Sequence, residues 1–566
     1  MRPYALLSAV LLTALNVPAA VAGAHRAHGA AHPLAKRDTS ASVTVDVPLH
    51  APSSAFTVGR DLVGLSIEGD RWAEWVGPKQ KNTYFNNLLN NLGAITGRPP
   101  NIRVGADSQD HTFFNKSVAV ATATFPASST ATPYPEASNV EVSGAYYALS
   151  RFLPKGTHVV WGVNLLSNDT DNAVLEAKAI TSTFSKGGAS HAAGITLDAL
   201  LIGNEPDLYA NKGYRLKASW TPGAFVSQWE SFAHAIINAT KLQARTTEIW
   251  FGAMDISSNI ASWAPFSPQN LFATGVLNSS LSSYIKTYSQ HHYQSSVCSD
   301  VSGPSAEIGT FMNKATIRSN LSLFDSDIAF VKSNGLAYIL GETNSISCHG
   351  YAGVSNTAAA ALWAIDYTLQ AVVHGITKLY FHEGIGYKYN MIQPVHLDSS
   401  PLDGTPVSLA PHIQPEYYAP IVIANFLGNS LTTKISELTI PTSSPASSYL
   451  SAYAAFDSKS GALKRAVLVN LNPFLATSNV TQSARPSTTV SLSLGSTKCP
   501  ESIHVRRLKI GHADDTSGLT FGGVSYETSS GKPSGKTVVE TVKVGKDGIA
   551  SVVISDSEAV LVEFKY

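Results

Sequence analysis

The chain has 566 residues, of which 44% are hydrophobic and 14% charged, and its 40 basic and 40 acidic residues give zero net charge. This composition excludes a largely disordered chain, and the length exceeds one ordinary core, so we expect two or more folded units. The charge balance, without a basic stripe, favours neither nucleic acid nor an anionic membrane surface as a partner.

The first 24 residues have the pattern of a secretory signal peptide. Arg2 supplies the positive charge, Ala5–Leu15 is an apolar run of suitable length, and small residues follow at 19–24. Lys36-Arg37 either ends a propeptide over residues 25–37 or is a solvated charge pair in a tail. No later apolar run reaches the roughly 18 residues of a transmembrane helix, so we expect a secreted, extracellular protein without a membrane span.

Secretion gives weight to sites of N-glycosylation, because the acceptor motif is used on extracellular chains. The sequence contains this motif at Asn115, Asn168, Asn238, Asn278, Asn320 and Asn479. We therefore expect a glycoprotein.

From about residue 62 to residue 383, short apolar runs alternate with longer helical stretches such as Trp220–Leu242 and Thr357–Val373. This alternation is typical of β/α units. The predicted strands are Leu62–Ile67, Asn101–Val104, His158–Val163, Ala199–Ile202, Glu248–Ala253, Tyr284–His291, Ala337–Leu340 and Lys378–Phe381. Eight strands close a barrel, so we predict an α/β fold with an eightfold β/α (TIM) barrel over residues 59–410.

After about Glu416 the pattern changes to strand-like runs separated by Gly, Ser and Pro turns, with no helix expected among them. This pattern predicts an antiparallel β-sandwich domain over residues 411–566. The alternating segment Ser42–Val47, within residues 38–58, predicts an N-terminal strand that joins the sandwich.

Three cysteines allow one disulfide and one free thiol. Cys298 and Cys348 both follow predicted barrel strands, so we expect a bridge between them, which leaves Cys499 free. No CxxC motif is present, and we expect no metal and no cofactor.

Two short segments each place a glutamate at the end of a predicted strand. Leu200–Ile202 runs into Gly203-Asn204-Glu205-Pro206, and Tyr338–Leu340 runs into Gly341-Glu342. A lone Gly-Glu is more often a polar strand end, but catalytic residues of such barrels lie at strand ends, and glycosidic bonds are cleaved by a pair of carboxylates. We predict that Glu205 is the acid/base, that Glu342 is the nucleophile, and that Asn204 hydrogen-bonds the sugar 2-hydroxyl.

The sixth predicted strand ends near His292 and Tyr293. A tyrosine hydroxyl at this place can hydrogen-bond the nucleophile and keep it ionised. The alternative is an aromatic packing residue in the barrel mouth.

These motifs carry a family resemblance. Gly64–Glu68, Gly203–Asp207, Gly341–Ser345 and the C-terminal β-domain resemble glycoside hydrolase family 79, a group of retaining β/α-barrel glycosidases of clan A. The family holds β-glucuronidases, 4-O-methyl-glucuronidases and heparanase. With the leader and the glycosylation motifs, the chain resembles a secreted fungal member.

The resemblance implies further contacts to the sugar. It implies that Glu68 and Asp107 hydrogen-bond sugar hydroxyls, although Asp107 can equally be a turn cap, and Tyr293 matches the family's strand-six tyrosine. It also implies that tyrosine hydroxyls and backbone N–H groups of the loop Ile346–Tyr351, which contains His349 and Gly350, hold the uronate carboxylate.

The expected function is hydrolysis of β-glucuronosyl or 4-O-methyl-glucuronosyl linkages of an oligo- or polysaccharide, by double displacement with retention. One alternative is a retaining β-glycosidase acting on neutral glucosides or xylosides. An alternative from another class is a non-catalytic carbohydrate-binding wall protein.

Overall fold

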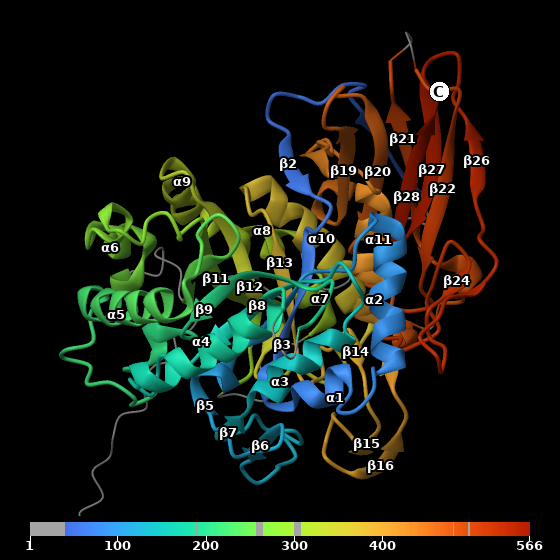
Figure 1. The fold of residues 1–566 in the computed structure, drawn as a ribbon. Coiled ribbons are helices and arrows are strands. Elements are labelled where there is room, and N and C mark those ends of the chain that lie inside the picture. The colour runs from blue at the N-terminus through green and yellow to red at the C-terminus, as the bar shows by residue number, and fades with distance from the viewer. Residues whose placement is uncertain (1–39, 188–190, 256–263, 299–306, 479, 496–498) are drawn as a thin grey trace, which may run out of the picture. The chain divides into compact units, whose positions relative to one another are not determined.

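The computed structural model describes residues 40–187, 191–255, 264–298, 307–478, 480–495 and 499–566 (Figure 1). The predicted leader over 1–24, the propeptide over 25–37 and the glycosylation motif at Asn479 lie outside these residues. Among the described helices, none combines the length and apolarity that crossing a bilayer requires.

Eight parallel strands close into a barrel, which confirms the predicted fold class. Each observed strand overlaps one predicted strand, and around the barrel they follow chain order, with β13 closing against β3. The strands are β3 (Val63–Glu68), β4 (Ile102–Gly105), β8 (His158–Val163), β9 (Thr196–Ile202), β10 (Glu248–Met254), β11 (Thr287–Ser296), β12 (Ala337–Ser347) and β13 (Leu379–Glu383).

The barrel interior is filled by apolar side chains, and a ring of helices covers its outside (Figure 1). The interior cluster contains Val160, Ala199, Leu201, Trp250, Ala253, Ile339 and Tyr380. Helix starts follow local chemistry, as in α5, where Thr221 accepts from Ala224 N–H and Pro222 occupies the first helical position. The helices are α1 (Trp72–Val76), α2 (Thr83–Thr96), α3 (Gly144–Ala148), α4 (Thr170–Phe184), α5 (Pro222–Thr240), α6 (Pro268–Ala273), α7 (Ile308–Phe311), α8 (Lys314–Ser322), α9 (Asp325–Ser333), α10 (Ala358–His374) and α11 (Tyr418–Leu427).

Helix α11 corrects the expectation that no helix follows Glu416. It comes after the last barrel strand and packs on α2 and α10, so it is the helix of the eighth β/α unit. Its sequence contains the β-branched run Ile421–Ile423 and resembles a strand, because every side chain but that of Asn425 is buried. The β-domain therefore begins after Gly428, which ends the helix with φ 74°, and not at residue 411.

Two sheets of the C-terminal domain share one apolar core, to which Val45, Leu468, Leu492, Val552 and Val560 contribute. One sheet pairs β1 with β21 in parallel and β21 with β27, and in the other β2 pairs β18. Both early strands thus belong to sheets of this domain. Its strands are β1 (Ser40–Asp46), β2 (Phe56–Gly59), β18 (Thr432–Glu437), β19 (Leu450–Asp457), β20 (Leu463–Asn470), β21 (Ser487–Ser493), β22 (Ser502–Lys509), β23 (Thr520–Phe521), β24 (Val524–Ser525), β25 (Ser534–Gly535), β26 (Glu540–Lys543), β27 (Ile549–Ser555) and β28 (Glu558–Lys565).

Polar contacts join the β-domain to the barrel helices. Arg318 of α8 pairs with Asp366 of α10 at 3.1 Å and with Glu437 of β18 at 2.6 Å, and Lys314 donates to the Leu450 carbonyl at 2.7 Å. The β-domain therefore supports the barrel through α8 and α10.

Small sheets lie in the loops that follow the second and eighth barrel strands. They consist of β5 (Thr112–Phe114), β6 (Ala121–Thr124) and β7 (Asn139–Val142) after β4, and of β14 (Ile392–Gln393), β15 (Leu397–Ser399), β16 (Pro406–Leu409) and β17 (His412–Ile413) after β13. Both loops extend from strand C-terminal ends, the end at which barrel enzymes carry their sites.

Candidate active site

The two predicted catalytic glutamates meet at the C-terminal end of the barrel. Glu205 lies three residues after the end of β9 and Glu342 lies in β12, and with His291 of β11 they offer ligand atoms that all lie within 4.8 Å of one another. Carboxyl groups about 5–5.5 Å apart are typical of retaining glycosidases, whereas inverting enzymes need about 6.5–9.5 Å. The geometry therefore allows direct attack by one carboxylate while the other transfers a proton.

Glu342 is held by donors on both of its oxygens. Arg103 Nη1 donates to Oε2 at 2.6 Å, and the Tyr293 hydroxyl donates to Oε1 at 2.7 Å. Burial alone would raise the pKa of Glu342, but the neighbouring His382, His291 and Arg103, together with the Tyr293 hydrogen bond, hold the pKa well below its usual range. The carboxylate is therefore ionised at neutral pH, as a nucleophile must be.

Glu205 has a different environment. Its backbone adopts the left-handed conformation with φ 47°, its N–H donates to the Ala253 carbonyl at 2.9 Å, and Pro206 then starts a 3₁₀ turn. Oε1 lies 3.1 Å from His291 Nδ1, and Oε2 lies 3.5 Å from Lys212 Nζ. Unlike Glu342, Glu205 is not contacted by a buried guanidinium.

A buried aspartate fixes the loop that carries Asn204 and Glu205. Asp110 Oδ2 accepts from Asn204 N–H at 2.9 Å and from the Tyr209 hydroxyl, and Oδ1 accepts from Leu165 N–H at 3.1 Å. Burial raises the pKa of Asp110 to about 6, although these hydrogen bonds oppose the rise. Asn204 Oδ1 accepts from Arg103 Nη2 at 2.6 Å, which leaves its NH₂ group to serve as a donor.

Glu68 and His382 form a second buried pair beside Glu342. Glu68 Oε1 accepts from Ser108 N–H at 2.7 Å, and Oε2 lies 3.5 Å from His382 Nε2. Within the described residues Glu68 Oε2 is buried and has no hydrogen-bond partner. Burial alone would lower the pKa of His382, but the carboxylates of Glu342 and Glu68 raise it to about 9.

Two other predicted contacts lie at the mouth of the site. Asp107 pairs with Lys212 at 3.3 Å and with His111 at 3.5 Å, and these partners hold its pKa at about 2 against the effect of burial. His349 Nε2 lies 2.5 Å from Glu136 Oε1, and its ring stacks on Tyr387 with centroids 3.9 Å apart.

Two predicted substrate contacts are wrong. His292 faces away from the site, because its Nδ1 lies 2.6 Å from the Tyr367 hydroxyl of α10 and adjacent strand residues point to opposite faces. The N–H of Gly350 donates to the Ile346 carbonyl at 3.0 Å and so cannot hold a carboxylate. Glycine is required there because φ is 84° and a Cβ would meet Tyr389 N at 2.8 Å.

Sequence reasoning missed Arg103, His291, His382 and Lys212. Arg103 stands inside the predicted strand Asn101–Val104, where a charged side chain is unusual and signals either a buried pair or a site. His382 directly follows the eighth predicted strand, a position that also signals function in this fold. Lys212 lies in a loop and carries no such signal.

Cys298 and Cys348 form a disulfide with Cα atoms 5.2 Å apart, and Cys499 is a free thiol. The bridge joins the segments that follow β11 and β12, the strands of Tyr293 and Glu342. It therefore restrains the loops directly above the nucleophile.

The glycosylation motifs differ in exposure. Asn168, Asn238 and Asn278 are exposed. The amide groups of Asn115 and Asn320 are part-buried and donate to Glu141 at 3.2 Å and to the Gln294 carbonyl at 3.0 Å. Attachment replaces one of the two hydrogens of the amide nitrogen, so at the latter two only one N–H remains for the bond.

Glu205, His291 and Glu342 could in principle ligate a cation, since their donor atoms lie close together. However, Arg103 and Tyr293 already donate to the two oxygens of Glu342. A positive guanidinium in direct contact opposes a cation there, so the trio is better suited to proton transfer and nucleophilic attack.

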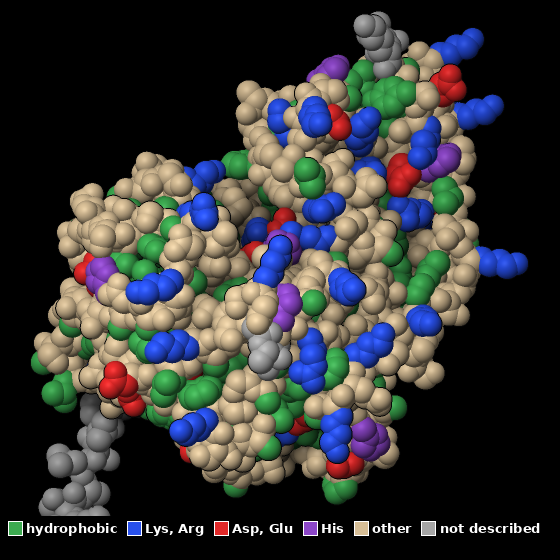
Figure 2. Space-filling view, viewed as in Figure 1, with side chains coloured by type: hydrophobic (Ala, Val, Ile, Leu, Met, Phe, Trp, Pro, Cys, Tyr) green, Lys and Arg blue, Asp and Glu red, His purple; other side chains and the backbone are tan. Residues whose placement is uncertain are grey.

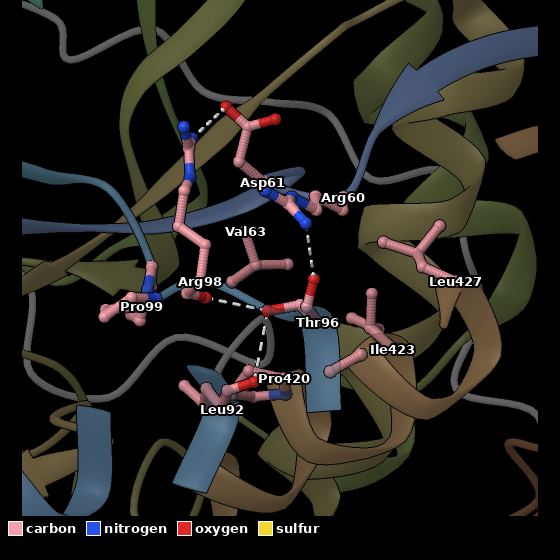
Figure 3. Close-up of a pocket in the computed structure, with 12 residues that line it drawn as sticks. Arg60, Asp61, Val63, Leu92, Thr96, Arg98, Pro99, Pro420, Ile423 and Leu427 are labelled. Atoms are coloured by element: carbon pink, nitrogen blue, oxygen red, sulfur yellow. Dashed lines mark hydrogen bonds and ion pairs between the residues drawn. The ribbon is translucent and has the colours of Figure 1, made fainter. Parts of the chain in front are cut away.

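The opposite end of the barrel carries a separate pocket (Figure 3). It is lined by residues including Asp61, Val63, Arg98, Pro420 and Leu427, and Val63 is the first residue of β3, whereas Glu68 is the last. Catalytic residues of such barrels lie at the C-terminal end of the strands, which is the opposite end. This pocket therefore belongs to the packing of α2 and α11 against the barrel.

The molecular face in Figure 2 carries Lys and Arg side chains that are scattered and do not merge into one basic surface. This distribution agrees with the zero net charge of the sequence.

A closed β/α barrel with two facing carboxylates at its strand ends, one of them held ionised, defines the class of β/α-barrel glycoside hydrolases. Residues 452–561 match the family model described as the glycosyl hydrolase family 79 C-terminal beta domain. This match supports membership in glycoside hydrolase family 79, which the sequence motifs indicated.

Curated relatives extend over nearly the whole chain. A β-glucuronidase of Aspergillus niger is 28% identical over 562 residues, covering 94% of this chain and 96% of the relative. A β-glucuronidase of Neurospora crassa is 29% identical over 545 residues, covering 87% and 89%.

Among solved structures, a 4-O-α-L-rhamnosyl-β-D-glucuronidase from Fusarium oxysporum 12S in complex with Rha-GlcA has a TM-score of 0.73 at 24% identity. The match covers 92% of this chain and 100% of that one. At this identity the likeness supports the fold.

Proposed function

We propose that the protein is a retaining β-glucuronidase that removes β-linked glucuronosyl groups from glycans. The observation that carries the proposal is that Glu205 and Glu342 each offer a carboxylate oxygen within 4.8 Å of the other, closer than an inverting mechanism needs, while Arg103 and Tyr293 bind both oxygens of Glu342. The two curated β-glucuronidase relatives support glucuronide as the substrate class.

The reaction has two displacements. Glu342 attacks the anomeric carbon, the glycosidic C–O bond breaks, and the proton of Glu205 passes to the leaving oxygen. Water then attacks the same carbon, its proton passes to Glu205, and the ester bond to Glu342 breaks to restore the carboxylate.

The surrounding residues have defined parts in this scheme. The NH₂ group of Asn204 donates to the sugar 2-hydroxyl, a contact that strengthens in the transition state. Glu68 Oε2 accepts from a hydroxyl deeper in the site. Tyr293 and Arg103 keep the nucleophile ionised and oriented.

The uronate carboxylate needs donors, and the loop amide of Gly350 is not one of them. We assign this part to the aromatic wall formed by His349, Tyr387 and Tyr389, whose rings pack against one another and against His382. No hydrogen bond occupies the Tyr387 hydroxyl within the described residues. It can therefore donate to a carboxylate.

Tyr387→Phe tests this assignment. We expect the ratio of kcat/KM for nitrophenyl β-glucuronide to kcat/KM for nitrophenyl β-glucoside to fall about tenfold, the typical value of a hydrogen bond to a charged group. An unchanged ratio would place the carboxylate elsewhere.

The same substrate pair tests the function itself. We expect the wild-type protein to prefer the glucuronide. Preference for the glucoside would indicate a β-glycosidase of neutral sugars, and failure on both substrates would favour a non-catalytic wall protein. Secretion and glycosylation are part of the proposal, and mass spectrometry of the protein from culture medium tests both.

A further inference from the structure

We propose that Lys212 and Tyr214, in the loop following Glu205, and His111, in the turn after β4, form a subsite for the sugar on the leaving-group side of the bond. The inference rests on the proposed glycosidase function and extends it to the chemical class of the leaving group. The proposed leaving group is a neutral pyranose that is part of a glycan.

A continuous series of contacts leads from the acid/base to this loop. Lys212 Nζ lies 3.5 Å from Glu205 Oε2 and 3.3 Å from Asp107 Oδ1. Asp107 Oδ2 lies 3.5 Å from His111 Nε2, and the His111 ring meets Tyr214 edge to face with centroids 6.1 Å apart. Lys212, Asp107, His111 and Tyr214 thus form one shelf, which we call the Lys212 shelf.

The shelf lies on the side of Glu205 from which the leaving group departs. Glu205 Oε1 lies 3.1 Å from His291, which also approaches Glu342, whereas Oε2 lies next to the shelf. Because Glu205 protonates the glycosidic oxygen, the leaving sugar begins at this carboxyl group.

The exposed fraction of the side chains increases from Glu342 toward the Lys212 shelf. The side chain of Glu342 is 8% exposed, that of Glu205 is 13% exposed and that of Lys212 is 40% exposed, and Tyr214 is 45% exposed. A glycan whose terminal sugar is buried at Glu342 must leave toward solvent. The exposed shelf next to the proton donor gives it a surface on which to lie.

The chemistry of the shelf selects a neutral, hydroxyl-rich ring. Lys212 supplies donors, Asp107 supplies acceptors, and the ion pair between them cancels their two charges. The half-exposed ring of Tyr214 offers an apolar face with a polar tip, which suits the C–H face and hydroxyls of a pyranose. An aglycone without hydroxyls would leave the donors and acceptors of the shelf unused.

The test compares two substrates that differ only in the leaving group. The first is a β-glucuronosyl disaccharide with a neutral hexose at the reducing end, and the second is β-glucuronosyl fluoride, whose leaving group is one atom. In Tyr214→Ala we expect the ratio of the two kcat/KM values, disaccharide over fluoride, to fall about fivefold to tenfold.

Tyr566→Ala is the matched control, because Tyr566 is 61% exposed at the end of the β-domain, and its ratio should equal that of the wild type. Equal losses on both substrates, or no loss on either, would overturn the Lys212 shelf while the β-glucuronidase function stands. Wild-type failure on glucuronosyl fluoride would overturn the proposed function. If the wild type acts on the β-glucosyl analogues instead, the same ratio measured on them decides the subsite alone.

Discussion

The two ends of the barrel carry similar charged residues but use them differently. At the N-terminal end, Asp61 Oδ2 accepts from both Arg98 at 2.9 Å and Lys378 at 2.7 Å, and the three side chains are 16–32% exposed. At the C-terminal end, Arg103 and Glu342 are at most 8% exposed, and the buried Oε2 of the adjacent Glu68 lacks a hydrogen-bond partner within the described residues.

The comparison shows how a cluster of charges that stabilises the fold differs from one that can act on a substrate. At the N-terminal end Arg98 and Lys378 are both paired with Asp61. Burial alone would raise the pKa of Asp61, but Lys378 and Arg98 lower it. At the C-terminal end, acceptors and donors remain for a substrate, and the pKa values of Glu342 and His382 are moved apart. Such separation of pKa values is typical of acid/base sites.

The largest expected difference between the two ends is in catalysis. Glu342→Gln should lower kcat by roughly 10⁴-fold or more, because the reaction loses its nucleophile. Asp61→Asn, the matched change at the N-terminal end, should leave kcat within about twofold and lower only the melting temperature. Steady-state kinetics and thermal unfolding of both variants check this, and a similar loss of kcat in both would remove the distinction.

Arg103 sharpens the comparison because it is wholly buried. Arg103→Met leaves the carboxylate of Glu342 and the amide oxygen of Asn204 without their donor, and losing one partner of a buried pair costs about 3–5 kcal/mol. We expect kcat/KM to fall roughly 10²- to 10³-fold. Arg98→Met, at the N-terminal end, is the control, and equal kinetic effects would contradict the assignment.

His382 should make stability depend on pH at the catalytic end. Its folded-state pKa of about 9 lies above the ordinary value of 6.5, so its contribution is fully present below 6.5 and is lost as pH rises through about 9. The difference in unfolding free energy between wild type and His382→Gln should shrink by on the order of 3 kcal/mol over this window. Chemical denaturation at pH 6 and pH 10 measures it, and a constant difference would contradict the charged state of His382.

Substitution of Tyr293 should have the smallest effect on catalysis. Tyr293→Phe removes one hydrogen bond from Glu342 Oε1 and should lower kcat about 10- to 100-fold. Because that bond lowers the pKa of Glu342, the acidic limb of the pH–rate profile should move to higher pH. Tyr284→Phe, which removes a hydroxyl that donates to the Leu242 carbonyl away from the site, is the control. A loss of rate without movement of the limb would make Tyr293 a packing residue only.

The sequence predicted the barrel well because each strand is a short, continuous apolar run between helical segments. The sequence also pointed to Glu205 and Glu342, because an acidic residue within three positions of the end of such a run is rare. It failed for α11, because a helix buried on nearly all sides loses the periodic pattern that marks helices.

The errors at the site have a similar cause. His292 and Tyr293 were both predicted to contact the substrate, yet neighbours on a strand cannot share a face, and the register of β11 on β12 shifts at His291. Arg103 was missed because its two partners, Glu342 and Asn204, are 239 and 101 residues away in sequence. Only the closed barrel brings them together.

The stereochemistry of the first product tests the central claim most directly. Proton NMR of the wild-type protein acting on nitrophenyl β-glucuronide should show β-glucuronic acid first, with the α-anomer appearing later by mutarotation, as two displacements through Glu342 require. If the α-anomer forms first, the two carboxylates act through a single inversion, and the role assigned here to Glu342 is wrong.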